Sequence, residues 1–277
     1  MIIVGVDGSA ASMRAVEWAA REAALRGQPL KILHAALRWE HHLPLVPQPP
    51  RWDAELAVAA QRMLDHAASR AREFCSDVAA EIADGGAADV LLAASRDAAM
   101  VAVGSRGRGG FAELLLGSVG RRLVDRASCP VAIVRNQHAP TGEVAVGVTG
   151  SADEDAVLTF AFEEAQLRGS TLRAVHAWTH PATRAPGDMQ PLVYDVEGIG
   201  QEETRLLAER LAGRREKYPD VGLVEDVVHE HPGRALIRAS AQADLVVAGT
   251  RRGLLGPGTV THAVTHHAVA PVVAVPY

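Results

Sequence analysis

Residues Val103–Gly120 read V-G-S-R-G-R-G-G-F-A-E-L-L-L-G-S-V-G and decide the fold. The apolar run Met100–Val103 stops at Gly104, and the chain returns at Gly117-Ser118 to a helical pattern. Glycines let a backbone approach a ligand closely, and the first N–H groups of a helix offer donors and a favourable dipole to an anion. Two arginines in the loop add positive charge. The stretch predicts a strand, a phosphate-binding loop and a helix, with a structural turn as the alternative.

The surrounding pattern of strands and helices occurs twice along the chain. V-G-V-D-G-S-A from Val4 is echoed by V-G-V-T-G-S-A from Val146, and A-S-C-P-V from Ala127 by A-V-A-P-V from Ala268. A period this long indicates duplicated domains, and alternating strands and helices predict a parallel sheet covered on both faces. We expect domains at residues 1–137 and 143–277, joined by a linker at 138–142.

Periodicity predicts the elements of the first copy. Strands are expected at 2–6, 30–36, 78–82, 100–103 and 131–134, and helices at 10–25, 53–76, 87–95 and 118–127. The stretch between Trp39 and Trp52 is too rich in proline for regular structure, so it is interpreted as a cover over the sheet edge or an anchor for a partner.

The bulk composition excludes several function classes. The chain has 277 residues, 48% of them hydrophobic, and a net charge of −5, which disfavours non-specific binding to nucleic acid. No apolar run reaches the length of a membrane span, and the first residues enter a strand without a signal-peptide pattern. Cys75 and Cys129 lack a C-x-x-C spacing. We therefore expect reduced thiols, a cytoplasmic location and no membrane partner.

The loop has a specific spacing: Gly104, two residues, Gly107, nine residues, then Gly117-Ser118. This is neither a Walker loop nor G-x-G-x-x-G. It resembles the nucleotide loop of ATP-binding universal stress proteins, and the resemblance to tandem members of that family covers nearly the whole chain. It implies two doubly wound α/β domains, each a five-stranded, mainly parallel sheet with helices on both faces. It also implies ATP, with Mg²⁺ as an optional companion, in the cleft between the first and fourth strands.

The resemblance assigns roles residue by residue. Asp7 would face the ribose or a nucleotide-bound Mg²⁺, and the backbone at Ala35 would meet the adenine. From its charge, Arg106 is expected to neutralise phosphate. The residues that would line the ribose and phosphates are Val103, Gly104, Gly107, Gly117, Ser118 and Val119.

The second copy departs from the pattern. Thr149 stands in place of Asp7, so the carboxylate is missing at that position, and Arg252 replaces the second glycine of the loop. The loop is also four residues shorter. The main ATP site is therefore expected in the first domain, and the candidates for a weaker or altered second site are Gly249, Gly253, Gly258 and Thr259.

Three functions remain open from the sequence. The first is a nucleotide-dependent signalling module of the stress response. The second is a weak Mg²⁺-dependent ATPase, although no catalytic residue is predicted. The third is a structural partner-binding protein with a vestigial second site. The expected partners are an adenine nucleotide, an unidentified protein, and either a second copy of the chain or the other half. A final strand at Val131–Val134 or Val272–Val275 leaves a sheet edge that needs covering.

Histidines offer no convincing metal site. His262 and His266 stand four residues apart on a helix, but they align with Arg121 and Asp125 of the first copy, which favours a solvated face. His34 recurs as a histidine in the second copy, and this repeat indicates a shared structural role beside the sheet.

Overall fold

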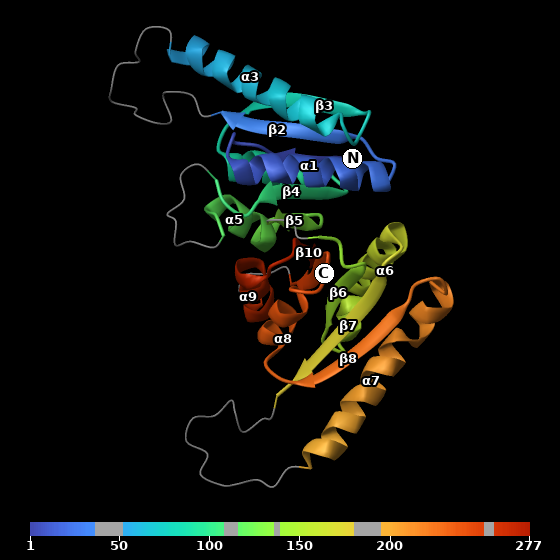
Figure 1. Cartoon of the computed structure of the whole chain (residues 1–277). Coiled ribbons are helices and arrows are strands. Elements are labelled where there is room, and N and C mark those ends of the chain that lie inside the picture. Colours follow the sequence, from blue (N-terminus) through green and yellow to red (C-terminus); the bar gives the residue numbers. More distant parts are fainter. Residues whose placement is uncertain (37–51, 108–115, 136–138, 180–194, 252–257) are drawn as a thin grey trace, which may run out of the picture. The chain divides into compact units, whose positions relative to one another are not determined.

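A computed structural model describes residues 1–36, 52–107, 116–135, 139–179, 195–251 and 258–277. Contacts between Cα atoms divide the chain into two compact units. The continuous part of the first is Met1–Asn136, and the second comprises mainly Gln137–Arg251 and Gly258–Val275. Each unit is an α/β structure built on a parallel sheet (Figure 1).

The first unit has five strands in the order β3-β2-β1-β4-β5. They are β1 (Ile2–Gly5), β2 (Leu30–Ala36), β3 (Val78–Asp84), β4 (Met100–Gly104) and β5 (Val131–Val134). The chain winds outward from β1 through β2 to β3 on one side and from β4 to β5 on the other. This reversal creates a topological switch point between β1 and β4, the place where ligands bind in open α/β sheets.

Among the residues that the structure describes, four helices cover the two faces of this sheet. They are α1 (Ala10–Leu25), α3 (Trp52–Ala71), α4 (Ala87–Ala94) and α5 (Ser118–Arg126). The first two pack against each other on one face, and α4 packs against α5 on the opposite face. Small residues along one side of α1, among them Ala15, Ala19 and Ala23, are fully buried, so the helix lies close to the strands beneath it.

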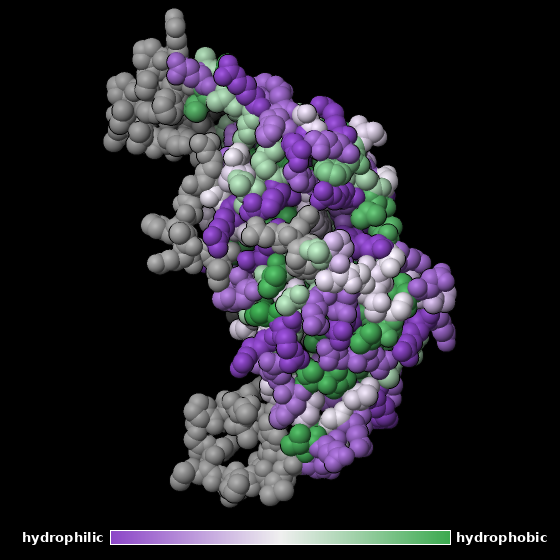
Figure 2. All heavy atoms as spheres, in the orientation of Figure 1, coloured by the Kyte–Doolittle hydropathy of each residue, from purple (hydrophilic) through white to green (hydrophobic). Residues whose placement is uncertain are grey.

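The second unit repeats this arrangement in the order β8-β7-β6-β9-β10. Its strands are β6 (Glu143–Val148), β7 (Thr171–Trp178), β8 (Leu223–His229), β9 (Leu245–Thr250) and β10 (Val272–Pro276). Its helices are the short η1 (Ala152–Glu154), then α6 (Asp155–Arg168), α7 (Val196–Lys217), α8 (Pro232–Ala239) and α9 (Thr259–His267). Figure 2 shows hydrophilic side chains over most of the face in view, with small hydrophobic patches among them.

The strand registers of the two units match. Ile2 pairs with Leu30 in the first unit, and Val144 pairs with Leu172 at the equivalent place in the second. These central strands are nearly continuous apolar runs because both faces of the sheet are covered. The fold class expected from the sequence is confirmed.

Two expected boundaries are wrong by several residues. The α3 helix ends at Ala71 rather than at Ser76, because the chain turns there and Cys75 is buried against the end of the sheet, with its Sγ next to the carbonyl oxygens of Gln28 and Asp77. Strand β3 continues to Asp84 because it pairs with β2 over that strand's whole length. Both differences come from contacts with residues distant in sequence. Cys75 and Cys129 are both buried and form no disulfide.

Candidate functional site

A cavity of about 490 Å³ lies at the carboxyl ends of β1 and β4, at the switch point of the first unit. This volume falls in the range of small-molecule sites. All nine residues predicted from the sequence for this site line the cavity. They are Asp7, Ala35, Val103, Gly104, Arg106, Gly107, Gly117, Ser118 and Val119.

Two glycines of the loop lie close to neighbouring atoms. A Cβ on Gly104 would lie 2.6 Å from the carbonyl carbon of Ala11 and 2.9 Å from the backbone nitrogen of Ser12. A Cβ on Gly107 would lie 2.7 Å from Oδ2 of Asp7. Only glycine therefore lets β4 pass so close to the backbone at the start of α1, whereas a Cβ on Gly107 would require the end of the Asp7 side chain to move. The predicted glycine spacing follows from these two close approaches.

The α5 helix points its N-terminus at the cavity. Its N-cap is Gly117, which has no side chain to accept from the first N–H groups, and its own N–H donates to Ser105 O at 2.9 Å. Gly117, Ser118 and Val119 all line the cavity. Backbone donors and the positive end of the helix dipole therefore face the space where an anion would sit.

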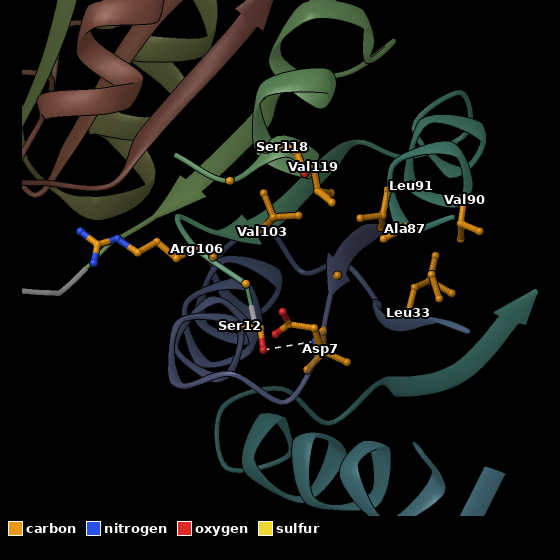
Figure 3. Close-up of a pocket in the computed structure, with 17 residues that line it drawn as sticks. Asp7, Ser12, Leu33, Ala87, Val90, Leu91, Val103, Arg106, Ser118 and Val119 are labelled. Atoms are coloured by element: carbon orange, nitrogen blue, oxygen red, sulfur yellow. Dashed lines mark hydrogen bonds between the residues drawn. The ribbon is translucent and has the colours of Figure 1, made fainter. Parts of the chain in front are cut away.

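The opposite side of the cavity is apolar. Leu33 comes from β2, and Val90 and Leu91 come from α4 (Figure 3). A Cβ on Gly5 would lie 2.7 Å from Cδ1 of Leu91, so α4 lies directly over the end of β1. An apolar slot next to a cluster of backbone donors suits a ligand with a flat ring at one end and an anion at the other.

Some of the lining residues were not predicted from the sequence. Those on α4 are distant from the loop along the chain and meet the cavity only when the chain is folded. The repeat contained a usable signal, since Gly5 and Leu91 correspond to Gly147 and Leu236, which make the same contact at 2.7 Å. The lining residues that were missed are Gly5, Val6, Ser12, Leu33, Ala87, Val90, Leu91 and Gly120.

Asp7 and Arg106 are the charged residues among those described that line the cavity. Oδ1 of Asp7 accepts from the backbone N–H of Ser9 at 2.9 Å, which orients the carboxylate. Arg106 lines the cavity, and its side chain extends away from the other labelled residues (Figure 3), so its role toward a phosphate stays a prediction. Burial lowers the pKa of Arg135, and the nearby charge of Arg106 lowers it further. Two guanidinium groups thus add positive potential beside the cavity.

A second cavity of about 390 Å³ occupies the equivalent place in the second unit. Gly249, Gly258 and Thr259 line it, as predicted, whereas Gly253 lies outside the described residues. The expected loss of the carboxylate is only half right. Thr149 does replace Asp7, but Glu154 brings a buried carboxylate into the same wall from the helical side. The sequence comparison missed it because Glu154 aligns with Ser12, which was not among the predicted site residues.

The recurring histidines have the structural role expected of them. His34 Nδ1 lies 2.9 Å from Val6 O, and His176 Nδ1 lies 2.9 Å from Val148 O. Because a carbonyl oxygen can only accept, each imidazole donates from Nδ1 and ties one strand to the end of the next. His176 also contacts Glu203 of α7, with Nε2 2.7 Å from Oε2.

Comparison with known proteins agrees with this architecture. The model of the universal stress protein family matches residues 1–135 and again residues 141–276. The chain belongs to the universal stress protein family. A universal stress protein of Mycobacterium tuberculosis H37Rv is 38% identical over 290 residues, covering 98% of this chain and 95% of the relative. Another from Mycolicibacterium smegmatis is 36% identical over 293 residues, covering 99% and 96% of the two chains.

The fold also has a close match among solved structures. The crystal structure of a universal stress protein from Archaeoglobus fulgidus superposes with a TM-score of 0.71 at 18% identity, covering 99% of this chain and 98% of that one. At this identity the likeness shows the fold alone. It supports two universal stress domains in tandem.

The described residues contain no helix that is both long and apolar enough to span a membrane. They also contain no group of three or more His, Cys, Asp or Glu side chains arranged to hold a metal ion.

Proposed function

We propose that this protein binds ATP in the first cavity and acts as a nucleotide-dependent signalling module of a stress response. The observation that carries the proposal is the close approach of Gly104 and Gly107 to α1 and Asp7, which opens a cradle of backbone donors beside the N-terminus of α5. The apolar slot at Leu33 and Leu91 supports a purine at the other end.

Each part of ATP has a suitable wall in this cavity. The adenine ring fits between the ends of β2 and α4, where the backbone at Ala35 supplies donors and acceptors. Asp7 accepts hydrogen bonds from ribose hydroxyls, because an ionised carboxylate only accepts. The phosphates meet Gly117 and Ser118 at the start of α5. Bound nucleotide would favour one partner-binding surface over another, to the extent that it binds the two states with different affinity.

Hydrolysis is the weaker alternative. Phosphoryl transfer needs a metal, charge stabilisation and a group that positions the attacking water. Among the described residues of the cavity, Asp7 is the one carboxylate, and it is already oriented by Ser9 N–H. We expect turnover to be slow. A Mg²⁺-dependent ATPase activity that disappears in Asp7→Ala would favour the enzyme over the switch.

The experiment that tests the proposal measures nucleotide in the freshly purified protein. The protein is denatured, and the released nucleotide is identified by chromatography and mass and counted per chain. Isothermal titration with ATP follows on the stripped protein. We expect about one ATP site per chain, in the first unit. ATP binding there uses backbone N–H donors, whereas the corresponding donors of the second cavity are partly engaged by the protein's own side chains.

Gly107→Asp serves as the site variant, because its side chain would meet the Asp7 carboxylate with a second negative charge. It should abolish ATP binding. Gly213→Ala is the matched control, since a Cβ on Gly213 has no neighbour within 4 Å and the residue lies on α7, in the second unit. A wild-type protein that neither carries nor binds ATP would refute the proposal and leave a structural partner-binding role.

A further inference from the structure

The helix α7 of the second unit is long but buries little of its surface. It runs beside β8 (Figure 1), and of its 22 residues, all of which the structure describes, Leu207 and Leu211 are buried. The equivalent helix of the first unit, α3, has 20 residues and is buried at Ala60, Leu64, Ala67, Ala68 and Ala71. Because most of the stability of a helix in a protein comes from its apolar packing, α7 is held less firmly by packing than α3.

The packing of α7 is concentrated toward its C-terminal end. Both buried leucines lie in the second half of the helix, and the C-cap residue Tyr218 is 5% exposed, with its ring stacked on Phe162 at 5.3 Å between centroids. Over 195–206, by contrast, every residue is half-buried or exposed. This half also contains Gly198 and Gly200, and glycine lowers the stability of a helix. The N-terminal half is therefore the weakly attached end.

One polar contact fastens this weakly attached half to the sheet. Glu203 Oε2 lies 2.7 Å from Nε2 of His176 in β7, which is 5% exposed. The other ring nitrogen of His176 lies 2.9 Å from Val148 O, so the imidazole joins α7 to the end of β6. On α3 the position of Glu203 is occupied by Ala60, which has no polar side-chain atom. The contact is therefore specific to the second unit.

Two arginines fasten the second half of α7 to the chain between β6 and α6. Arg210 Nη2 donates to Ser151 O at 2.6 Å and to Asp155 Oδ1 at 3.3 Å. Arg214 Nη2 donates to Asp155 O at 3.1 Å and to its Oδ1 at 3.0 Å. Arg210 Nε also lies 4.0 Å from Glu154 Oε1. The Asp155 side chain is 69% exposed, so dissolved salt screens its part of this attachment.

The residues that hold α7 also form part of the second cavity. His176, Glu154 and Thr149 all line it. Glu154 is 2% exposed, and its Oε2 accepts from Thr149 N at 2.7 Å and from Thr149 Oγ1 at 2.9 Å. A change in the cavity wall at Thr149 therefore alters the segment that Arg210 contacts.

We propose that α7 is a latch, which opens from its N-terminal end about the anchor at Tyr218 while the sheet of the second unit stays folded. Opening breaks the contact between Glu203 and His176 first and releases polar atoms of the cavity wall. In the other direction, a ligand that displaces His176 or Glu154 loosens the helix, because coupling between two sites is reciprocal. The proposal concerns the second unit and does not depend on ATP binding by the first cavity.

Hydrogen exchange of the full chain, followed by mass spectrometry of its peptides, tests the latch. After correction for intrinsic rates, amides over 199–206 should exchange at least about tenfold faster than those of α3 and of 211–217, because local opening is easier where less apolar surface is buried. Raising NaCl from about 0.05 M to about 0.5 M should speed exchange in α7 and leave α3 unchanged, because the salt screens the exposed ion pairs. The buried strand β9 should stay protected. Equal rates in α3 and α7, or α7 as slow as β9, would overturn the proposal.

Glu203→Ala removes the contact at the free end of the latch. It should speed exchange over 199–206 about tenfold, the factor that corresponds to one lost hydrogen bond. Glu202→Ala is the matched control, because Glu202 pairs with Arg205 on the surface and both side chains are 66% exposed. Its exchange should match that of the wild type. Equal effects of the two substitutions would remove Glu203 from the latch.

Thr149→Val tests the coupling between the cavity wall and the helix. It keeps a similar side-chain shape but removes the hydroxyl that donates to Glu154, and it should speed exchange in α7 while leaving α3 unchanged. In the other direction, Arg210→Ala should speed exchange of the Thr149 and Gly150 amides, which both donate to Glu154. If circular dichroism shows that Arg210→Ala does not fold, Arg214→Gln replaces it. Wild-type exchange of α7 in Thr149→Val, with unchanged amides at 149–150 in the arginine variant, would overturn the coupling.

Discussion

Single glycines determine how closely the backbone can pack around the first cavity. Gly104 lies against the backbone of Ala11, whereas its counterpart Gly249 lies against side chains. A Cβ on Gly249 would lie 2.6 Å from Tyr277 Cε1 and 3.0 Å from Val157 Cγ2. Backbone cannot move aside as a flexible side chain can. The same residue type at equivalent positions therefore carries different constraints in the two units.

We predict that Gly104→Ala destabilises the first unit by about 1–3 kcal/mol, the usual range for overpacking, because its Cβ would overlap Ala11 and force β4 away from α1. Urea unfolding followed by circular dichroism measures the effect. Gly213→Ala, within α7, should instead stabilise by about 0.5–1 kcal/mol, since it adds helix propensity without a clash. An unchanged midpoint for Gly104→Ala would show that β4 and α1 can separate freely.

The helices α3 and α7 occupy equivalent places but are attached differently. Where α3 has Ala60, Ala67 and Ala71, all buried, α7 has Glu203, Arg210 and Arg214. Glu203 pairs with His176, and Arg214 Nη2 donates to Asp155 Oδ1 at 3.0 Å. Both helices bury apolar side chains, Leu64 on α3 and Leu207 and Leu211 on α7, but α7 carries polar contacts at positions where α3 has buried alanines. Polar contacts of this kind depend on geometry more strongly than apolar packing does.

Glu203→Ala should lower the free energy of unfolding by about 1–3 kcal/mol, because buried His176 loses the acceptor at its Nε2. Glu202→Ala is the matched control. Its side chain is 66% exposed and pairs with Arg205 on the surface, so its removal should leave the stability almost unchanged. Chemical denaturation of the two variants side by side tests the difference. Equal losses would mean that the His176 contact contributes nothing beyond a surface ion pair.

At the scale of the whole molecule, the chain contains two copies of the same α/β unit. The residues that line their cavities differ. The registers of the central strands agree between the copies, so the switch point is preserved in both. The residues that differ between the copies include Asp7 and Ser12 at the first cavity, which correspond to Thr149 and Glu154 at the second. Substitutions at the strand ends can change a binding site while the sheet beneath it is preserved.

We predict that ATP selectively stabilises the first unit. A ligand at about 100 times its Kd adds about 2.7 kcal/mol to the stability of the state that binds it. Differential scanning calorimetry of the full chain should therefore show the transition of the first unit moving to higher temperature with ATP. Gly107→Asp should remove this shift and leave the unfolding of the second unit in place. A uniform shift that survives in Gly107→Asp would place the ATP site elsewhere.

Much of the fold followed from local pattern. Apolar runs such as Met100–Val103 and the helical periodicity of Ala10–Leu25 gave strands and helices within a few residues of their bounds, because these signals are contained in short stretches. The end of α3 and the length of β3 could not be found this way. They depend on burial of Cys75 and on pairing with β2.

The sequence by itself determined the duplication and the glycine spacing, since both are patterns along the chain. Its resemblance to the universal stress protein family supplied eight of the nine predicted residues that line the first cavity, and the charge of Arg106 supplied the ninth. Only the tertiary structure decided that Leu91 closes the apolar side of the first cavity, that the Arg106 side chain extends outward, and that Glu154 brings a carboxylate to the wall of the second cavity. The physical reason is that these features depend on side chains from separate elements meeting at one edge of a sheet. Their distances are set by packing and hydrogen bonding, which local sequence does not encode.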